Sequence, residues 1–184
     1  MTTGLKEWSA AVHALLAGRQ TVLLRKGGIH EKRFEVTAGE FLLFPTVAHS
    51  HADRVRPEHR DLLTPAMADS TETDIVIRAA AKVVAAVEVY RPDELDAIAD
   101  LHIWTSDSVR ADRVDFRPKH RLTVLVVQAS SLLAPLRLAR TPDFAGCKSW
   151  LPLPADPAES AAGQPVHDEA ALQAIADRVR YCVG

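Results

Sequence analysis

The sequence of 184 residues is poor in cysteine and contains no long apolar run. Its two cysteines, Cys147 and Cys182, form no CxxC pair, which argues against a secreted disulfide scaffold and fits a reducing cytoplasm. No window approaches the roughly 18 uncharged apolar residues that a membrane helix needs. Residues 1–20 lack a basic segment followed by an apolar core, so no signal peptide is expected. These absences predict a cytoplasmic protein without a membrane segment.

A strong excess of charge of either sign is also missing. The 22 Lys and Arg residues against 24 Asp and Glu residues give a formal net charge of −2. That balance excludes a surface coated in positive charge, but it is compatible with a local basic patch. Apolar residues make up 47% and charged residues 25% of the chain, as in ordinary globular proteins. The length predicts a single domain over residues 1–184.

Apolar periodicity predicts helices at both ends of the chain. Apolar residues recur at helical spacing over residues 5–17 and stop before Gly18, a residue typical of helix C-termini. Near the other end, Asp168 can cap a helix with an apolar face of Leu172, Ile175, Ala176, Val179 and Val183.

Short β-branched and apolar runs predict strands between these helices. We expect three of them to form a small antiparallel sheet packed on the first helix: residues 21–26, 33–36 and 41–44. Residues 75–90 favour one long or bulged strand, and residues 122–133 favour a second buried strand. The remaining stretches are expected to be a loop with short helical turns, 47–73, and an exposed Pro/Ala-rich connection, 152–165. The predicted class is α+β with a mostly antiparallel or mixed sheet or barrel.

The stretch LLRKGGIHE, residues 23–31, has two interpretations. Gly27 and Gly28 can let backbone N–H groups close on a phosphate, with Arg25 and Lys26 adding charge-assisted hydrogen bonds. The same residues suit a hairpin turn, in which glycine supplies positive φ and the cations stay solvated. GxxxxGK[ST] and GxGxxG are absent, so no nucleotide-binding fold of those kinds is implied.

A run of histidines follows. His49 and His51 stand two residues apart, and His59 could complete a zinc site. No cysteine or further ligand completes a known pattern, so solvated loop histidines are the default and neither a metal nor a cofactor is predicted.

Two later segments combine cations with aromatic residues. FRPKHR, residues 116–121, contains Lys119 and His120 and suits contact with a single-stranded nucleic acid, or equally a solvated loop before a buried strand. GCKSW, residues 146–150, places Cys147 and Lys148 beside Trp150. A thiolate nucleophile or a Trp stacking on a base is one interpretation; a small turn with a packed Trp is the other.

Four motifs resemble a bacterial family known as a domain of unknown function: KEW at 6–8, LLRKGGIHE at 23–31, FLLFPT at 41–46 and GCKSW at 146–150. The resemblance spans nearly the whole chain and implies no particular activity. At one position the chain departs from the family, since His51 stands where a Gln is expected.

LLAGRQTVLLRKGG followed by VTAGEFLLFP is similar to the opening of ASCH domains in the PUA-like superfamily. The matching residues are Gly18, Arg19, Thr21, Arg25 and the pair Gly39-Glu40. The resemblance implies a small β-barrel associated with RNA and modified nucleobases. Gln20 stands where ASCH amidohydrolases carry a catalytic Lys, and Leu23 stands where a polar or acidic residue is expected, so the hydrolytic chemistry is not implied.

Our leading hypothesis is a PUA-like protein that binds RNA, single-stranded nucleic acid or a modified nucleotide. The candidate ligand-binding residues are Arg19, Arg25, Lys26, Gly27, Gly28, Lys119, His120, Lys148 and Trp150. The alternatives are a hydrolase or nuclease acting on nucleic acid or nucleotide, with Glu31, His30 and His49 as acid/base candidates, and an interaction scaffold with an exposed apolar patch.

Overall fold

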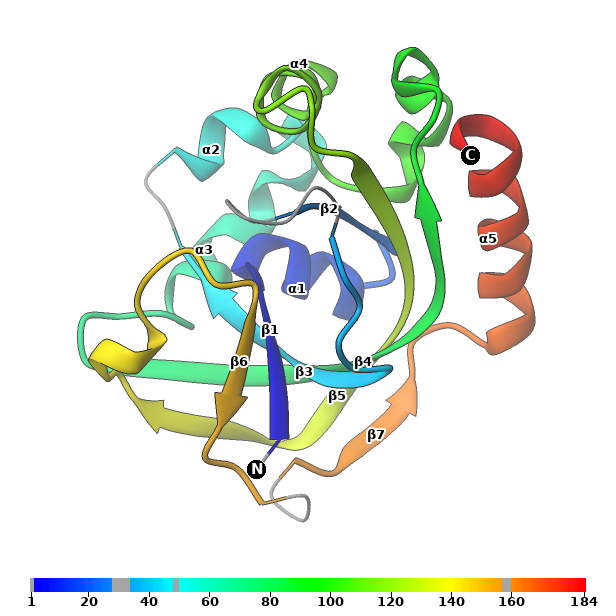
Figure 1. Cartoon of the computed structure of the whole chain (residues 1–184). Helices are drawn as coiled ribbons and strands as arrows, with labels where there is room; N and C mark the ends of the chain where they lie inside the picture. Colours follow the sequence, from blue (N-terminus) through cyan, green and yellow to red (C-terminus); the bar gives the residue numbers. More distant parts are fainter. Residues whose placement is uncertain (1, 28–33, 48–49, 157–159) are drawn as a thin grey trace.

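A computed structural model describes residues 2–27, 34–47, 50–156 and 160–184 (Figure 1). The strands are β1 Thr2–Trp8, β2 Val22–Lys26, β3 Glu40–Thr46, β4 Asp74–Glu88, β5 Leu122–Ala139, β6 Trp150–Leu153 and β7 Ala162–Pro165. The α-helices are α1 Ser9–Leu16, α2 His51–Arg54, α3 Leu63–Met67, α4 Ser106–Val109 and α5 Glu169–Val183. The 3₁₀ segments are η1 Pro57–Leu62, η2 Pro92–Leu101 and η4 Pro142–Phe144, and η3 Arg110–Asp115 is a π segment.

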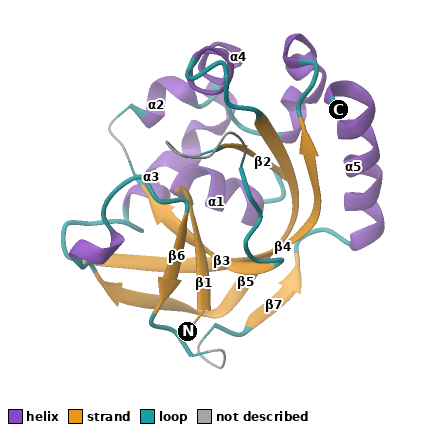
Figure 2. Cartoon of the chain, in the orientation of Figure 1, coloured by secondary structure: helices purple, strands orange, loops and turns teal. Residues whose placement is uncertain are grey.

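The strands form one mixed sheet in the order β2-β5-β4-β3-β1-β6, with β7 paired to β5. Among the strand pairs of the described residues, β1 and β3 alone are parallel. The predicted α+β class, with a mostly antiparallel mixed sheet and helices near both ends, is confirmed. Figure 2 shows α2 and α4 along the top of the sheet and α5 at its right side.

The sheet curls around α1, which contacts β1, β3, β4 and β5 (Figure 1). Leu5, Val12, Leu15 and Leu125 belong to the apolar cluster between α1 and the sheet. A larger cluster joins the other side of α1 to the apolar face of α5: Leu172, Ala176, Val179 and Val183. None of the helices in the described ranges is long and apolar enough to cross a membrane.

The prediction for residues 5–17 is wrong in its first part. Leu5 and Trp8 lie on β1, which pairs with both β3 and β6, and the helix begins only at Ser9. The backbone of Trp8 is extended, with φ −65° and ψ 130°. Sheet pairing on both sides of β1 therefore overrides an apolar spacing that is also compatible with a helix.

The predicted three-stranded sheet of residues 21–26, 33–36 and 41–44 is also wrong. Residues 34–36 form no strand, and β2 pairs with β5 rather than with β3. β3 is flanked by β1 and β4, so both of its edges are occupied. Pairing between strands about 100 residues apart along the chain replaces the local hairpin that the glycines suggested.

Predictions for the long strands are confirmed. β4 is one strand with register shifts at Ile77/Ala79 and Val83/Ala85, and β5 extends the expected strand to Ala139. The C-terminal helix is capped as expected, because the Asp168 side chain accepts a hydrogen bond from the Ala171 amide at 2.7 Å. Within 152–165, expected to be a connection, the structure contains the end of β6 and all of β7.

Candidate nucleic-acid interface

Three aromatic side chains in the described part of the chain are largely exposed: Tyr90 (61%), Phe116 (56%) and Tyr181 (82%). Exposed aromatic rings are uncommon, because burying one contributes more to stability than burying most other side chains. Each of the three has an arginine as its neighbour in the sequence, in the pairs Tyr90-Arg91, Phe116-Arg117 and Arg180-Tyr181.

All three rings belong to segments that meet at one end of the sheet. The pairs Lys26↔Leu122 and Glu88↔Thr123 place the end of β2, the start of β5 and the end of β4 side by side. The Tyr90 amide donates to the Val183 carbonyl at 2.9 Å, which brings the end of α5 to the same place. This end lies at the top of Figure 1, near α4 and the C-terminus. We call it the aromatic end; it comprises Lys26, Tyr90, Arg91, Phe116, Arg117, Lys119, His120, Arg121 and Tyr181.

Two of the rings carry a guanidinium over their faces. Cζ of Arg117 lies 4.9 Å from the centre of the Phe116 ring, and Cζ of Arg121 lies 5.0 Å from the centre of the Tyr90 ring. Glu88 accepts hydrogen bonds from the Tyr90 hydroxyl at 2.6 Å and from Arg121 at 3.1 Å. These flat ring–guanidinium pairs are the kind of surface on which an unpaired base can stack.

The turn after Phe116 has an uncommon backbone. Arg117 has φ 52°, in the left-handed region, and its carbonyl accepts a hydrogen bond from the His120 amide at 2.9 Å. A left-handed backbone costs a non-glycine residue about 1–2 kcal/mol. The residue with this backbone conformation, Arg117, is also the one whose guanidinium lies over the Phe116 ring.

Lys26, one of the two cations of the opening motif, supports this turn. Its Nζ donates to the carbonyls of Arg113 at 2.7 Å, Val114 at 3.3 Å and Phe116 at 2.5 Å. Burial lowers the pKa of Lys26, and the nearby Arg113 guanidinium adds to that effect. Lys26 thus connects the end of β2 to the carbonyls at the end of η3.

Arg25 faces a different set of groups. Its Nη1 donates to the Lys6 carbonyl at 2.9 Å and to Glu7 Oε2 at 3.1 Å, and its Cζ lies 5.3 Å from the centre of the Phe34 ring. Glu7 is buried, and Arg113 donates nearby to the Leu24 carbonyl at 3.1 Å. Burial lowers the pKa of Arg113, whereas Glu7 acts to raise it.

The remaining sequence candidates are spread over the molecule. Arg19 is exposed and bonds both carboxylate oxygens of Asp61, at 2.8 and 2.9 Å. Lys148 is exposed, and Gly27 is buried at the end of β2. Four candidates lie outside the described residues: Gly28, His30, Glu31 and His49.

Trp150 is half-buried rather than presented as a free ring. It stacks on Phe34 with a centroid distance of 5.8 Å and meets Phe41 edge-on at 5.1 Å. Its Nε1 donates to the Glu35 carbonyl at 2.9 Å. Because Arg25 and Trp150 both contact Phe34, the structure brings the GCKSW segment close to Arg25.

One arrangement of serine, histidine and aspartate needs a separate assessment. Ser9 Oγ lies 3.1 Å and His13 Nε2 lies 2.6 Å from the same oxygen, Oδ2 of buried Asp69. A serine nucleophile would instead donate to the histidine, which in turn would be oriented by the carboxylate. This network therefore ties α1 to Asp69 and does not activate Ser9. No group of three or more metal-binding side chains occurs in the ranges that the structure describes.

Sequence reasoning found part of the aromatic end and missed the rest. Lys26, Lys119 and His120 were among the candidates, and Phe116 and Arg117 were in the basic segment. Tyr90, Arg91 and Tyr181 were missed because they join this surface only through β4 and α5. The adjacent aromatic–arginine pairs are a signal that could have found them.

Solved structures with similar backbones were compared with this one. ASCH from Zymomonas mobilis is similar over 68% of this chain and 66% of that chain, with 12% identity and a TM-score of 0.42. A serine-to-alanine mutant of the same ASCH is similar over 95% of this chain and 94% of that one, with 11% identity and a TM-score of 0.47. A tyrosine-to-phenylalanine mutant gives 12% identity and a TM-score of 0.46, over 95% of this chain and 96% of that one.

Among curated proteins, none matches this chain. The match that identifies a family comes from the sequence, and it agrees with the predicted resemblance of the KEW, LLRKGGIHE, FLLFPT and GCKSW motifs. It extends over residues 4–178, nearly the whole chain. The chain therefore belongs to the family described as a domain of unknown function, DUF1802.

Proposed function

We propose that the protein binds RNA or another single-stranded nucleic acid at the aromatic end. The observation that carries this proposal is the gathering of all largely exposed aromatic rings of the described residues at one end, two of them with a guanidinium on the ring face. Stacking of a base on an aromatic side chain contributes about 1–3 kcal/mol and tolerates any base, because every base has a π-face.

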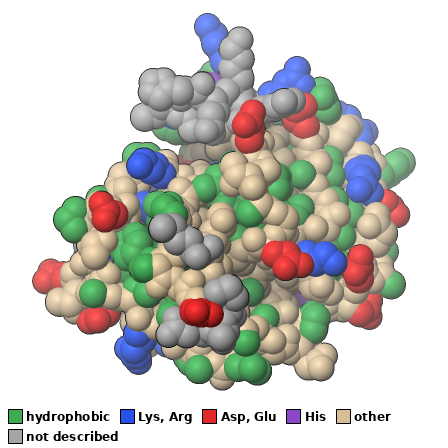
Figure 3. Space-filling model, turned by 60° about the horizontal axis from the view of Figure 1, so that its bottom comes forward, with side chains coloured by type: hydrophobic (Ala, Val, Ile, Leu, Met, Phe, Trp, Pro, Cys, Tyr) green, Lys and Arg blue, Asp and Glu red, His purple; other side chains and the backbone are tan. Residues whose placement is uncertain are grey.

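The local charge supports the same proposal. Residues 116–121 contain no carboxylate, and although Arg121 is paired with Glu88, Arg117 and Lys119 keep this turn positive in a chain of net charge −2. Figure 3 views the molecule with the lower part of Figure 1 turned forward, and on that face Lys and Arg side chains are scattered, several beside a carboxylate. A phosphate backbone is attracted to clustered cations and gains little from isolated, paired ones.

The candidate residues would have different roles. We assign phosphate contacts to Lys119 and His120, and base stacking to Phe116 and Tyr90. Lys26 would act indirectly by holding the carbonyls of residues 113–116 in place. Lys148 and the half-buried ring of Trp150 would extend the surface toward Phe34 for a longer strand, and a modified nucleotide would be recognised as part of that strand. Arg25 would act indirectly, because its guanidinium is held by Glu7 and the Lys6 carbonyl. Arg19, paired with Asp61, would contact the strand only where it extends beyond the aromatic end.

The test is fluorescence anisotropy with labelled single-stranded RNA and DNA over a salt series. Phe116→Ala should weaken binding about 5- to 150-fold, the equivalent of 1–3 kcal/mol. Lys119→Ala should weaken binding of all sequences and lower the slope of log Kd against log salt by about 1. Matched controls are Leu133→Ala, an exposed apolar residue of β5, and Arg137→Ala, at the opposite end of β5 from Arg121.

Both controls should bind like the unchanged protein. The proposal fails if no single-stranded nucleic acid binds even at low salt. It also fails if Leu133→Ala and Arg137→Ala weaken binding as much as Phe116→Ala and Lys119→Ala do.

A further inference from the structure

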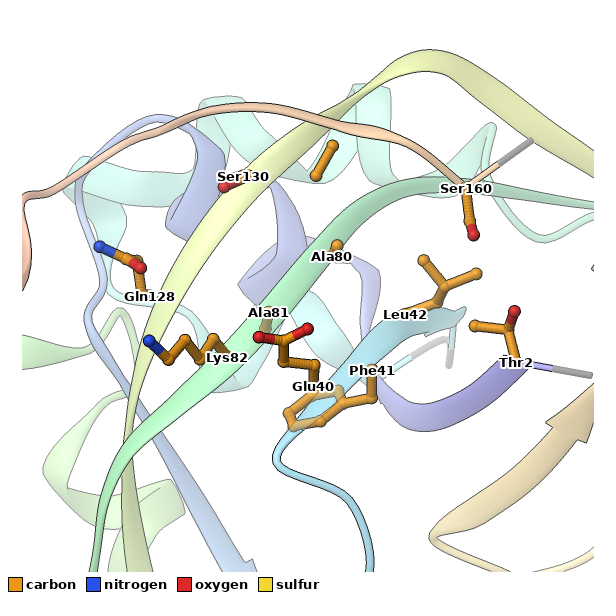
Figure 4. Close-up of a pocket in the computed structure, with 11 residues that line it drawn as sticks. Thr2, Glu40, Phe41, Leu42, Ala80, Ala81, Lys82, Gln128, Ser130 and Ser160 are labelled. Atoms are coloured by element: carbon orange, nitrogen blue, oxygen red, sulfur yellow. The ribbon is translucent and has the colours of Figure 1, made fainter. Parts of the chain in front are cut away.

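A pocket of about 540 Å³ lies on the face of the sheet formed by β3, β4 and β5 (Figure 4). Thr2 of β1, Ser160 and Ala162 border it on one side. Its volume lies within the range of about 300–1,000 Å³ that is usual for small-molecule sites. No local pattern in the sequence predicts this pocket, because its walls come from five separate segments.

Strand register builds the pocket from two rows of side chains. Glu40 pairs with Lys82 and Lys82 with Gln128, so these three residues stand in one row across β3, β4 and β5. Two positions along each strand, Leu42, Ala80 and Ser130 form the next row on the same face. The side chains of Ala80 and Ser130 are small, and the hollow lies above them (Figure 4).

The first row places one acidic and one basic residue, Glu40 and Lys82, at the rim of the pocket. Side chains directly opposite each other on neighbouring strands are about 5 Å apart at Cβ. In Figure 4 the Lys82 ammonium points toward Gln128 and away from the Glu40 carboxylate. The ion pair of Lys82 is with Glu169 at 3.7 Å, and both side chains are largely solvent-exposed. An exposed pair of this length contributes little, so Lys82 can exchange it for a ligand.

The second row makes the floor apolar at one end and polar at the other. Leu42 is buried in an apolar cluster on this same face of the sheet, and Ala80 packs against that cluster. Ser130 supplies a hydroxyl at the β5 side of the floor. Gln128 donates its Nε2 hydrogen to the His167 carbonyl at 3.0 Å, which fixes the amide at the wall.

We propose that this pocket binds an α-amino acid with a large apolar side chain. Its ammonium group pairs with Glu40, its carboxylate pairs with Lys82, and its side chain lies over Leu42 and Ala80. A zwitterion satisfies both charges at once, whereas an anion or a cation alone leaves one of them opposed by a like charge or unpaired. A neutral heterocycle makes a charged contact with neither residue.

The pocket is independent of the nucleic-acid proposal. Lys82 and Glu88 are six residues apart on β4, about 20 Å at the usual rise of a strand, so the pocket and the aromatic end are separate places. The failure of either proposal therefore has no consequence for the other.

The experiment is saturation-transfer NMR and calorimetry on the full chain with three probes. L-phenylalanine carries both charges, L-phenylalaninamide lacks the carboxylate, and N-acetyl-L-phenylalanine lacks the ammonium. We expect L-phenylalanine to bind and each blocked analogue to bind about tenfold more weakly or less. Equal binding of all three, or binding of guanosine in place of L-phenylalanine, would overturn the proposal.

Variants assign each charge to its partner. Glu40→Gln should weaken the binding of L-phenylalanine about tenfold but leave the binding of N-acetyl-L-phenylalanine, which lacks the ammonium, unchanged. Lys82→Gln should likewise weaken L-phenylalanine binding but leave the binding of L-phenylalaninamide, which lacks the carboxylate, unchanged. Ala80→Leu should abolish binding by filling the floor. Glu169→Gln is the control, since it removes only the exposed partner of Lys82. The affinity of this variant for L-phenylalanine should stay unchanged or rise. If Glu40→Gln still discriminates against the N-acetyl analogue, the assignment of Glu40 is wrong.

Discussion

Asp69 is a buried carboxylate on which three side chains converge. Ser9 Oγ and His13 Nε2 contact Oδ2, and Arg78 Nε contacts Oδ1 at 2.6 Å. Burial acts to raise the pKa of Asp69, but the hydrogen bonds from His13 and Arg78 outweigh it and hold the pKa below its usual value. The ionised form is therefore the one that the fold uses.

Asp69→Asn should destabilise the protein by about 1–3 kcal/mol, because it removes the counter-charge of Arg78 and weakens the buried hydrogen bonds from Ser9 and His13. The measurement is urea denaturation at neutral pH. Asp61→Asn serves as the matched control; its pair with Arg19 is largely exposed, and the loss should be about 1 kcal/mol or less. Equal effects of the two substitutions would mean that the Asp69 network contributes nothing beyond a surface pair.

At the residue scale, the sequence shows which side chains can donate hydrogen bonds or stack, but not which groups they contact in the fold. The sequence predicted that Arg25 and Lys26 either donate to a phosphate or stay solvated, whereas in the structure they donate to a carboxylate and to backbone carbonyls. A loop binding an anion and a lysine binding carbonyls look alike in sequence. What distinguishes them is residues 113–116, almost ninety positions away from Lys26. Likewise, the sequence could not tell the half-buried ring of Trp150 from the exposed ring of Phe116, because exposure depends on Phe34 and Phe41.

The contact between β2 and η3 is the feature to test at the scale of elements. Lys26→Met keeps the length of the side chain but removes three hydrogen bonds from a charged donor, each of which contributes about 1.5–3 kcal/mol when well formed. We expect amides of residues 110–117 to exchange hydrogen faster, with less change in β4 and β5. Hydrogen–deuterium exchange measured by mass spectrometry checks this.

Lys119→Met is the control, because Lys119 is exposed in the same turn. Exchange in residues 110–117 should be unaffected by it. Unchanged exchange in Lys26→Met would show that η3 is held by its own packing and that Lys26 adds nothing.

Sequence predicted the long elements well and the short ones poorly. β5 and α5 carry a signal over 15 or more residues, so pattern and structure agree. β1 is seven residues long and α1 is eight. The apolar residues of the two elements follow one another at a spacing that fits a single helix, so the spacing cannot show where the strand ends and the helix begins. Pairing of β2 with β5 instead of β3 also lies beyond local pattern, since it depends on which strands flank β3.

At the scale of the whole molecule, the fold brings together side chains that are far apart in the sequence. The aromatic end draws on β2, β4, the turn before β5 and the end of α5, and the pocket draws on the middle of β3, β4 and β5. Neither could be predicted from composition, because a net charge of −2 says nothing about where the cations gather.

Two buried histidines should make the stability of the whole molecule depend on pH. Burial lowers the pKa of His51 and of His102 to about 4, with Arg54 and Arg56 respectively adding to the effect. Both rings are neutral in the folded protein at neutral pH, whereas in the unfolded chain they take up a proton near pH 6.5. Stability is thus fully present above pH 6.5 and is lost as the pH falls toward 4, where the folded protein also binds the protons.

Within that window the free energy of unfolding should fall by about 1.4 kcal/mol per pH unit for each histidine. Urea denaturation between pH 7.5 and 4.5 measures the slope. His102→Asn should lower the slope by the contribution of one histidine. The variant should still fold, because the asparagine oxygen can replace Nδ1 as the acceptor of the Trp104 amide hydrogen, a bond of 3.2 Å. His51, stacked on Trp8 at 3.9 Å between ring centres, would supply the remaining slope. A stability that stays constant from pH 6.5 to 4.5, or a His102 ring that titrates near 6.5 in the folded protein by NMR, would contradict this account.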